Sequence, residues 1–146
     1  MVAKTKIFRA GVIPFVQENN QVQMLFMKPS VPEFGGDVWQ VAKGKQEDGE
    51  DIKETALREA REELGLFRGN IITLESIGEW LGRTTFFIAH IKQKDMFGDP
   101  HYETGDTRWM TLEQFMEDGR DLHKPVVKSA HRKILKILKE NKSPNG

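Results

Sequence analysis

The spacing of apolar residues along the chain predicts strands that alternate with helices. Short apolar runs bounded by turn-forming and charged residues predict strands at residues 6–16, 22–27, 39–42, 70–79, 84–91 and 108–110. Pro14 lies inside the first run and has no backbone N–H to donate, so it predicts an edge strand or a bulge. Polar, glycine-containing segments between the runs predict loops, chiefly 29–37, 43–49 and 92–104.

The clearest helix signal covers residues 52–64. Apolar residues recur there at intervals of three or four, at Ile52, Ala56, Leu57, Ala60 and Leu64. Glu50 and Asp51 place negative charge at the N-terminus, where the helix dipole favours it. Gly65 predicts a left-handed C-cap, and Leu66 is placed to fold back onto the last turn.

Two further helices are predicted near the C-terminus. Thr111 is a typical N-cap for a short helix over 112–118, which Gly119 ends. Pro125 favours the first turn of the final helix, whose predicted buried stripe comprises Ala130, Ile134, Ile137 and Leu138. Strands that alternate with amphipathic helices predict an α/β fold in which a mixed sheet lies between helices.

Three glutamates on the first helix are spaced so that they share one side. Glu59, Glu62 and Glu63 stand at i, i+3 and i+4, with Glu63 at the edge of the apolar stripe and the other two further toward the polar side. Like charges at this spacing repel, which predicts a bound cation, and carboxylate oxygens suit Mg²⁺ or Mn²⁺. The alternative is an ordinary solvated helix with pairs such as Glu54–Arg58.

The stretch 44–66 resembles the signature of the Nudix hydrolases, G-x5-E-x7-R-E-U-x-E-E-x-G-U, in which U is an apolar residue. The signature positions are filled by Gly44, Glu50, Arg58, Glu59, Ala60, Glu62, Glu63, Gly65 and Leu66. The resemblance implies an α/β/α sandwich and hydrolysis of a nucleoside diphosphate linked to another group. A nucleotide-sensing module of the same fold that does not cleave its ligand is the alternative.

The resemblance also implies roles for individual residues. The implied metal ligands are Glu59, Glu62 and Glu63, assisted by the Gly44 carbonyl. Arg58 would orient the glutamates, and Glu50 would hold the loop to the helix or reach the metal through water. Divalent ions neutralise a pyrophosphate and lower the pKa of bound water, and a glutamate near that water would act as general base.

Three weaker features resemble the branch that contains the dinucleoside polyphosphate hydrolases and the RNA 5′-pyrophosphohydrolases. Residues 8–12, F-R-A-G-V, resemble the opening strand F-R-x-x-V of that branch. Residues 39–44, W-Q-V-A-K-G, resemble its W-Q-x-P-K-G segment, although Ala42 replaces the proline and Lys45 replaces a second glycine. Glu103, six residues before Trp109, resembles a loop glutamate that binds metal or acts as base.

These features favour a small nucleotide substrate, either a dinucleoside polyphosphate or an ADP-ribose-like compound. A capped or triphosphorylated RNA 5′ end is the alternative. Arg9, Lys43 and Lys45 are candidates to contact phosphates, although each is also typical of a solvated surface. Aromatic residues that are candidates to stack a base, or else belong to the core, are Trp80, Tyr102, Phe34 and Phe86.

Two other groups are predicted to lie at the surface without a chemical role. The final helix carries a basic stripe that is typical of the solvated face of an amphipathic helix, formed by Lys128, Arg132, Lys136 and Lys139. Contact with an RNA backbone is the alternative. His101, His123 and His131 lack metal-ligand spacing and are predicted to be surface or capping residues.

Composition narrows the class of protein. The 146 residues suit one domain, 1–146. The chain has no cysteine, no apolar run long enough to span a membrane and no signal-peptide core, which predicts a cytoplasmic protein that does not enter a membrane. A formal net charge of +0 gives no global field for DNA. The sequence leaves monomer and homodimer open.

Overall fold

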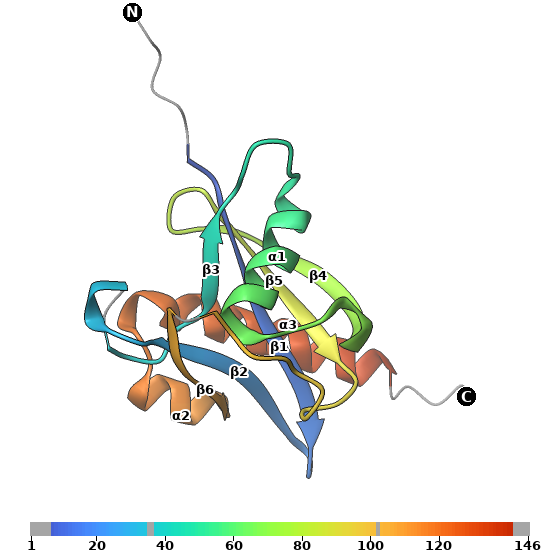
Figure 1. Ribbon diagram of the computed structural model, residues 1–146. Coiled ribbons are helices and arrows are strands. Elements are labelled where there is room, and N and C mark those ends of the chain that lie inside the picture. The colour runs from blue at the N-terminus through green and yellow to red at the C-terminus, as the bar shows by residue number, and fades with distance from the viewer. Residues whose placement is uncertain (1–6, 35–36, 102, 142–146) are drawn as a thin grey trace, which may run out of the picture.

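A mixed sheet forms the middle of the computed structural model (Figure 1), which describes residues 7–34, 37–101 and 103–141. Its strands are β1 (Arg9–Glu18), β2 (Gln21–Pro29), β3 (Ala42–Lys45), β4 (Ile71–Trp80), β5 (Thr84–Ile91) and β6 (Thr104–Met110). Their order is β4-β5-β1-β2-β6, with β3 paired to β1. The β1–β5 pair is parallel and the others are antiparallel.

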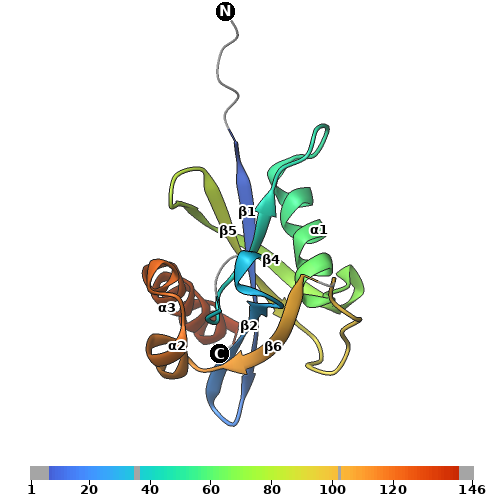
Figure 2. The ribbon, with the colours of Figure 1, turned by 60° about the vertical axis from the view of Figure 1, so that its left-hand side comes forward.

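Helices cover both faces of this sheet, which confirms the predicted α/β/α sandwich (Figure 2). Helix α1 (Ile52–Leu64) packs its small residues Ala56 and Ala60 on one face. Helices α2 (Leu112–Asp118) and α3 (Lys124–Asn141) cover the other face and bury the larger cluster of aromatic and aliphatic side chains. No helix in the described ranges is long and apolar enough to cross a membrane.

The helix ends follow the sequence signals. Asp51 caps α1 by accepting a hydrogen bond from Glu54 N at 2.8 Å. Gly65 adopts φ 73° at the C-cap, and Leu66 N donates back to Ala60 O at 3.2 Å. Helix α2 begins with a capping box between Thr111 and Gln114. In α3 the predicted stripe is buried except at its edge, where Ile137 is half-buried.

The prediction that Pro14 marks an edge or a bulge is wrong, because β1 is the central strand. Pro14 pairs with Ala89 of β5 on one side. On the other side, β1 pairs with β3 from Arg9 to Val12 and with β2 from Phe15 to Glu18. Pro14 therefore faces the gap between two strands that share one edge of β1, where no backbone donor is required.

Two strand boundaries also differ from the prediction. The strand expected at 39–42 lies at 42–45, and residues 39 and 40 make only isolated bridges. Strand β6 begins at Thr104, four residues before the expected 108. Both segments are polar, so the hydrophobic pattern carried no signal for their pairing with β1 and β2.

Candidate active site

The carboxylates of α1 lie against β3, and a glycine allows the close approach. Gly44 pairs with Ala10 of β1, and a Cβ atom at Gly44 would overlap the Glu59 carboxylate. Glu59 is consequently only 8% exposed. The prediction that Glu59 lies toward the polar side of the helix is wrong, because β3 covers that side.

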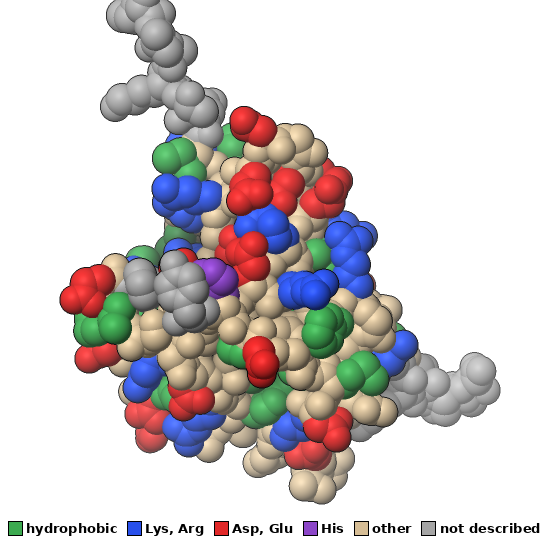
Figure 3. Space-filling model, in the orientation of Figure 1, with side chains coloured by type: hydrophobic (Ala, Val, Ile, Leu, Met, Phe, Trp, Pro, Cys, Tyr) green, Lys and Arg blue, Asp and Glu red, His purple; other side chains and the backbone are tan. Residues whose placement is uncertain are grey.

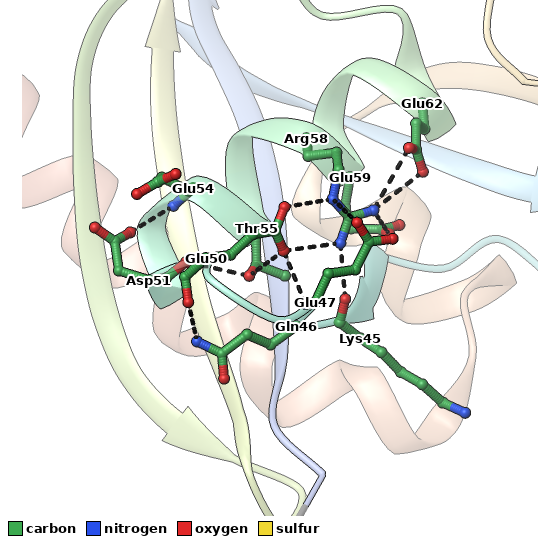
Figure 4. A network of polar contacts seen from close by, with 10 residues as sticks. All are labelled: Lys45, Gln46, Glu47, Glu50, Asp51, Glu54, Thr55, Arg58, Glu59 and Glu62. Atoms are coloured by element: carbon green, nitrogen blue, oxygen red, sulfur yellow. Dashed lines mark hydrogen bonds and ion pairs between the residues drawn. The ribbon is translucent and has the colours of Figure 1, made fainter.

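Arg58 organises this part of the site (Figure 4). Its Nε donates to Glu50 Oε2 at 2.6 Å, and its Nη1 donates to Glu59 Oε1 at 2.8 Å. The Glu62 carboxylate accepts a longer bond of 3.3 Å from Nη1, and the Lys45 carbonyl oxygen accepts one of 2.8 Å from Nη2. One guanidinium therefore joins β3, the loop before α1 and two turns of α1.

Glu50 fixes the loop to the helix. Besides Arg58, its carboxylate accepts hydrogen bonds from Thr55 Oγ1 and Glu47 N, both at 2.9 Å. The Arg58 bond, followed by the Glu47 amide, lowers the pKa of Glu50 to about 2. Arg58 forms no ion pair with Glu54 within the described ranges, so the solvated-helix alternative does not describe this arginine.

Glu59 and Glu63 experience the opposite environment. Burial, followed by the charge of Glu59, raises the pKa of Glu63 to about 8. Burial, followed by the charge of Glu62, likewise raises the pKa of Glu59. The Glu63 carboxylate accepts a hydrogen bond from Lys43 N at 3.2 Å, and no ion pair reaches it from any described residue. Glu59 is paired with Arg58, so the negative charge that α1 and β3 leave without an ion pair is that of Glu63 in its ionised form.

These groups open into a groove of about 590 Å³. Its lining comprises Lys43, Gly44, Lys45, Gln46, Glu47, Arg58, Glu59, Glu62, Glu63, His101 and Glu103. The structure thus brings Glu103, from the loop before β6, to the same groove as the α1 glutamates. The Glu103 side chain is 49% exposed and lies 3.7 Å from His101 Nδ1.

The donor set suits a hard divalent cation in its chemistry. Carboxylate oxygens from Glu59, Glu62 and Glu63 border one groove, and a cation bound there would favour the ionised forms of Glu59 and Glu63, whose pKa values are raised in its absence. Within the part of the chain that the structure describes, no three acidic or imidazole groups converge on a ready-made ion site. Arg58 accounts for this, because it holds Glu59 and Glu62 toward itself.

The predicted substrate contacts fall into three groups. Lys43 and Lys45 line the groove, and Arg9 pairs with Lys45 across β1 and β3. Burial, followed by the charges of Arg120 and Arg9, lowers the pKa of Lys43. Trp80 packs against the core on the α3 side, and Phe86 is fully buried. Tyr102 and the Phe34 side chain lie outside the described residues.

A turn after α2 supports the segment that leads into β3, and no local pattern in the sequence predicted this contact. Arg120 N donates to Trp39 O at 2.8 Å, and Val41 N donates to His123 Nδ1 at 3.0 Å. His123 is fully buried, so its predicted surface position is wrong. Burial lowers the pKa of His123 to about 3, which keeps Nδ1 available as an acceptor.

Comparison with known proteins agrees with this geometry. A family model described as NUDIX domain matches residues 6–132. Bis(5′-nucleosyl)-tetraphosphatase [asymmetrical] from Rattus norvegicus is 30% identical over 116 residues, which cover 74% of this chain and 76% of that protein. RNA pyrophosphohydrolase from Shewanella oneidensis is 26% identical over 122 residues, which cover 65% and 70%.

Solved structures show the same fold. An Ap4A hydrolase of C. elegans in a binary complex has a TM-score of 0.72 at 17% identity, covering 89% of this chain and 98% of that one. The NUDIX domain of Shewanella oneidensis NrtR complexed with ADP ribose has a TM-score of 0.69 at 13% identity, covering 90% of each. The chain belongs to the Nudix family. It is a hydrolase of phosphoric anhydride bonds.

Proposed function

We propose that the protein is a Mg²⁺-dependent pyrophosphohydrolase whose substrate is a dinucleoside polyphosphate. The observation that carries the proposal is the groove whose lining combines the α1 glutamates with Lys43 and Lys45. Acidic ligands for a cation and basic contacts for phosphates are the two requirements for binding a metal–polyphosphate complex. The rat tetraphosphatase, at 30% identity, supports this substrate class.

Glu59, Glu62 and Glu63 would hold the ions, with the Gly44 carbonyl as a further ligand. When bound, the ions would neutralise the phosphate chain and acidify a water molecule. The chain's own contribution is positional. Arg58 holds Glu59 and Glu62 and is itself fixed by Glu50 and the Lys45 carbonyl oxygen, so the two glutamates would turn from a fixed guanidinium toward a bound ion. Lys43 and Lys45 would contact the phosphates as point charges.

Glu103 would accept the proton of the attacking water. Its carboxylate lies at the rim of the groove and is half-exposed, so it can approach a bound substrate without leaving a buried ion pair. Glu103→Gln keeps the shape of the side chain but removes the base, and we expect a fall in kcat of about 10²-fold or more with KM little changed. An unchanged kcat would show that Glu103 is only a solvated loop residue.

A triphosphorylated or capped RNA 5′ end is the second candidate substrate, because the RNA pyrophosphohydrolase of Shewanella oneidensis is also a relative. Turnover of RNA would depend steeply on salt, since phosphate contacts along a strand release counterions. Turnover of a small nucleotide would show a weaker dependence.

The test is product analysis of the purified protein with Mg²⁺ and with EDTA. The panel comprises diadenosine polyphosphates, ADP-ribose, nucleoside triphosphates, and triphosphorylated or capped short RNA. A clearly higher kcat/KM for diadenosine polyphosphates supports the proposal. A preference for another class of compound would identify that class as the substrate instead. Saturable binding without any product would instead identify a nucleotide-sensing module.

Glu62→Gln tests the role of the glutamates separately from substrate choice. Glu62 is exposed and its bond to Arg58 is long, so the substitution should leave the fold intact. We expect a rate lower by about 10² to 10⁴. Glu117→Gln on the exposed face of α2 is the matched control and should retain full activity. Near-normal turnover of Glu62→Gln would contradict the assignment.

A further inference from the structure

A second groove, of about 800 Å³, runs along the outer side of α1. Arg61, Phe67, Arg68 and Pro100 are among the residues that line it. It shares Arg58, Glu62 and His101 with the groove that is lined by the glutamates, so the two grooves adjoin. Figure 3 shows this face, where basic and hydrophobic side chains lie beside the acidic cluster.

The wall of this second groove is held in place by backbone contacts. Gly98 N donates to Gly65 O at 2.7 Å, and His101 N donates to Glu62 O at 2.5 Å. A Cβ atom at Gly65 would overlap the Gly98 carbonyl, and one at Gly98 would come within 2.5 Å of the Phe67 ring. Two glycines therefore let the end of α1 and the loop after residue 97 meet directly. The groove is formed before any ligand arrives, which lowers the entropic cost of binding.

Two arginines of this groove, Arg61 and Arg68, are not paired with carboxylates of any described residue. Phe67 is 39% exposed, and the Arg61 guanidinium lies 5.0 Å above its ring. A phenyl ring and a guanidinium plane are surfaces on which nucleobases stack, and guanidinium groups bind phosphates. Asp99, also in the lining, supplies an acceptor for the amino group of a base.

We propose that this second groove binds the second nucleoside of the dinucleoside polyphosphate. The proposal rests on the proposed function above and adds a subsite to it. A dinucleoside polyphosphate carries a nucleoside on each side of the bond that breaks. Lys43 and Lys45 lie in the first groove and Arg61 and Phe67 lie in the second, with Glu62 in the lining of both. A phosphate chain that binds to cations held by Glu62 would therefore extend one end into each groove.

The test compares two substrates that share a phosphate chain but differ in the second nucleoside: diadenosine tetraphosphate and adenosine 5′-tetraphosphate. Phe67→Ala removes the stacking ring, and Arg61→Gln removes the guanidinium. We expect each variant to raise KM for diadenosine tetraphosphate by about tenfold. KM for adenosine tetraphosphate and kcat for both substrates should change less than about twofold. Arg132→Gln, an exposed arginine of α3, is the matched control.

Each outcome decides a separate point. Equal losses on both substrates, or no loss on either, would overturn the subsite. Losses confined to a triphosphorylated oligonucleotide would overturn it in favour of RNA. If the wild-type protein cleaves none of these compounds, the proposed function fails on its own. Calorimetric titration of the two nucleotides then tests the groove, and equal affinities for them would overturn it. Melting temperatures identify a variant that has lost its fold. If one of the two variants does not fold, the other still tests the subsite.

Discussion

Glu63→Gln should make the metal-free protein more stable at alkaline pH, although it removes a residue of the candidate active site. Glu63 lies beside Glu59 and has no ion-pair partner among the described residues. The amide of the replacement has nearly the same shape, and its oxygen can still accept the hydrogen bond from Lys43 N. The substitution therefore removes the cost of a buried charge while it preserves the packing.

The sign and size of the effect follow from the pKa of Glu63. Because this pKa is raised from 4.5 to about 8, the folded protein keeps a proton that the unfolded chain loses between these values. The free energy of unfolding therefore falls as pH rises from 4.5 to 8 and levels off above 8. At about 1.4 kcal/mol per pKa unit the fall is at most about 5 kcal/mol. Since Glu63 is not fully buried and neighbouring groups relax, we expect about 2–4 kcal/mol.

The assay is urea unfolding of both proteins in EDTA at pH 5 and pH 8. The free energy of unfolding of the wild-type protein should fall by about 2–4 kcal/mol from pH 5 to pH 8, and that of Glu63→Gln should fall clearly less. Adding Mg²⁺ at pH 8 should raise the free energy of unfolding of the wild-type protein by about 2.7 kcal/mol when Mg²⁺ is at a hundred times its Kd. The variant, which lacks one carboxylate ligand, should respond less at the same Mg²⁺ concentration.

Glu117→Gln, on the exposed side of α2, controls for the loss of one negative charge and should behave like the wild-type protein. The reasoning is refuted if Glu63→Gln keeps the full wild-type dependence on pH. It is also refuted if Mg²⁺ stabilises both proteins equally, because Glu63 would then neither carry the buried charge nor bind the ion.

Two further substitutions test the framework of the site. Gly44→Ala places a Cβ atom on the Glu59 carboxylate, so it should lower kcat about tenfold or more and weaken stabilisation by Mg²⁺. Gly69→Ala, which meets nothing within 4 Å, should do neither. His123→Phe leaves the buried Val41 N–H without its acceptor and should cost about 1–3 kcal/mol in the free energy of unfolding. The wild-type protein should also lose stability as pH falls from 6.5 toward 3, because only the unfolded chain binds a proton at this histidine in that range. The variant should lack this loss.

The α1 region was predictable because its signals are local. The cap at Asp51, the left-handed Gly65 and the register of the glutamates all follow from residues within one or two turns. Glu59 was misplaced because helix periodicity describes only the face that packs on the sheet. The second surface, which β3 provides through Gly44, depends on strand pairing with β1 that no local pattern encodes.

The support behind β3 could not be predicted for a similar reason. Val41 and His123 are 82 residues apart in the sequence, and a lone histidine near a helix start is most often exposed or capping. The outer groove along α1 has the same origin. Its walls meet where Gly65 and Gly98 come into contact, and the sequence around either glycine does not indicate that the other lies beside it. The sequence therefore shows which residues are present, but only the fold determines which of them come into contact.

The contrast between Glu50 and Glu63 explains how one arginine supports a site with so many glutamates. Arg58 and two further donors hold Glu50 ionised, with a pKa of about 2, so it acts as a fixed part of the scaffold. Glu63 lies beyond the reach of Arg58 and has a pKa of about 8. Its ionised form is stabilised only when a cation takes the place of the missing ion-pair partner. The same residue type thus serves as scaffold at one position and, in our proposal, as cation ligand at the other, and the position of Arg58 determines which.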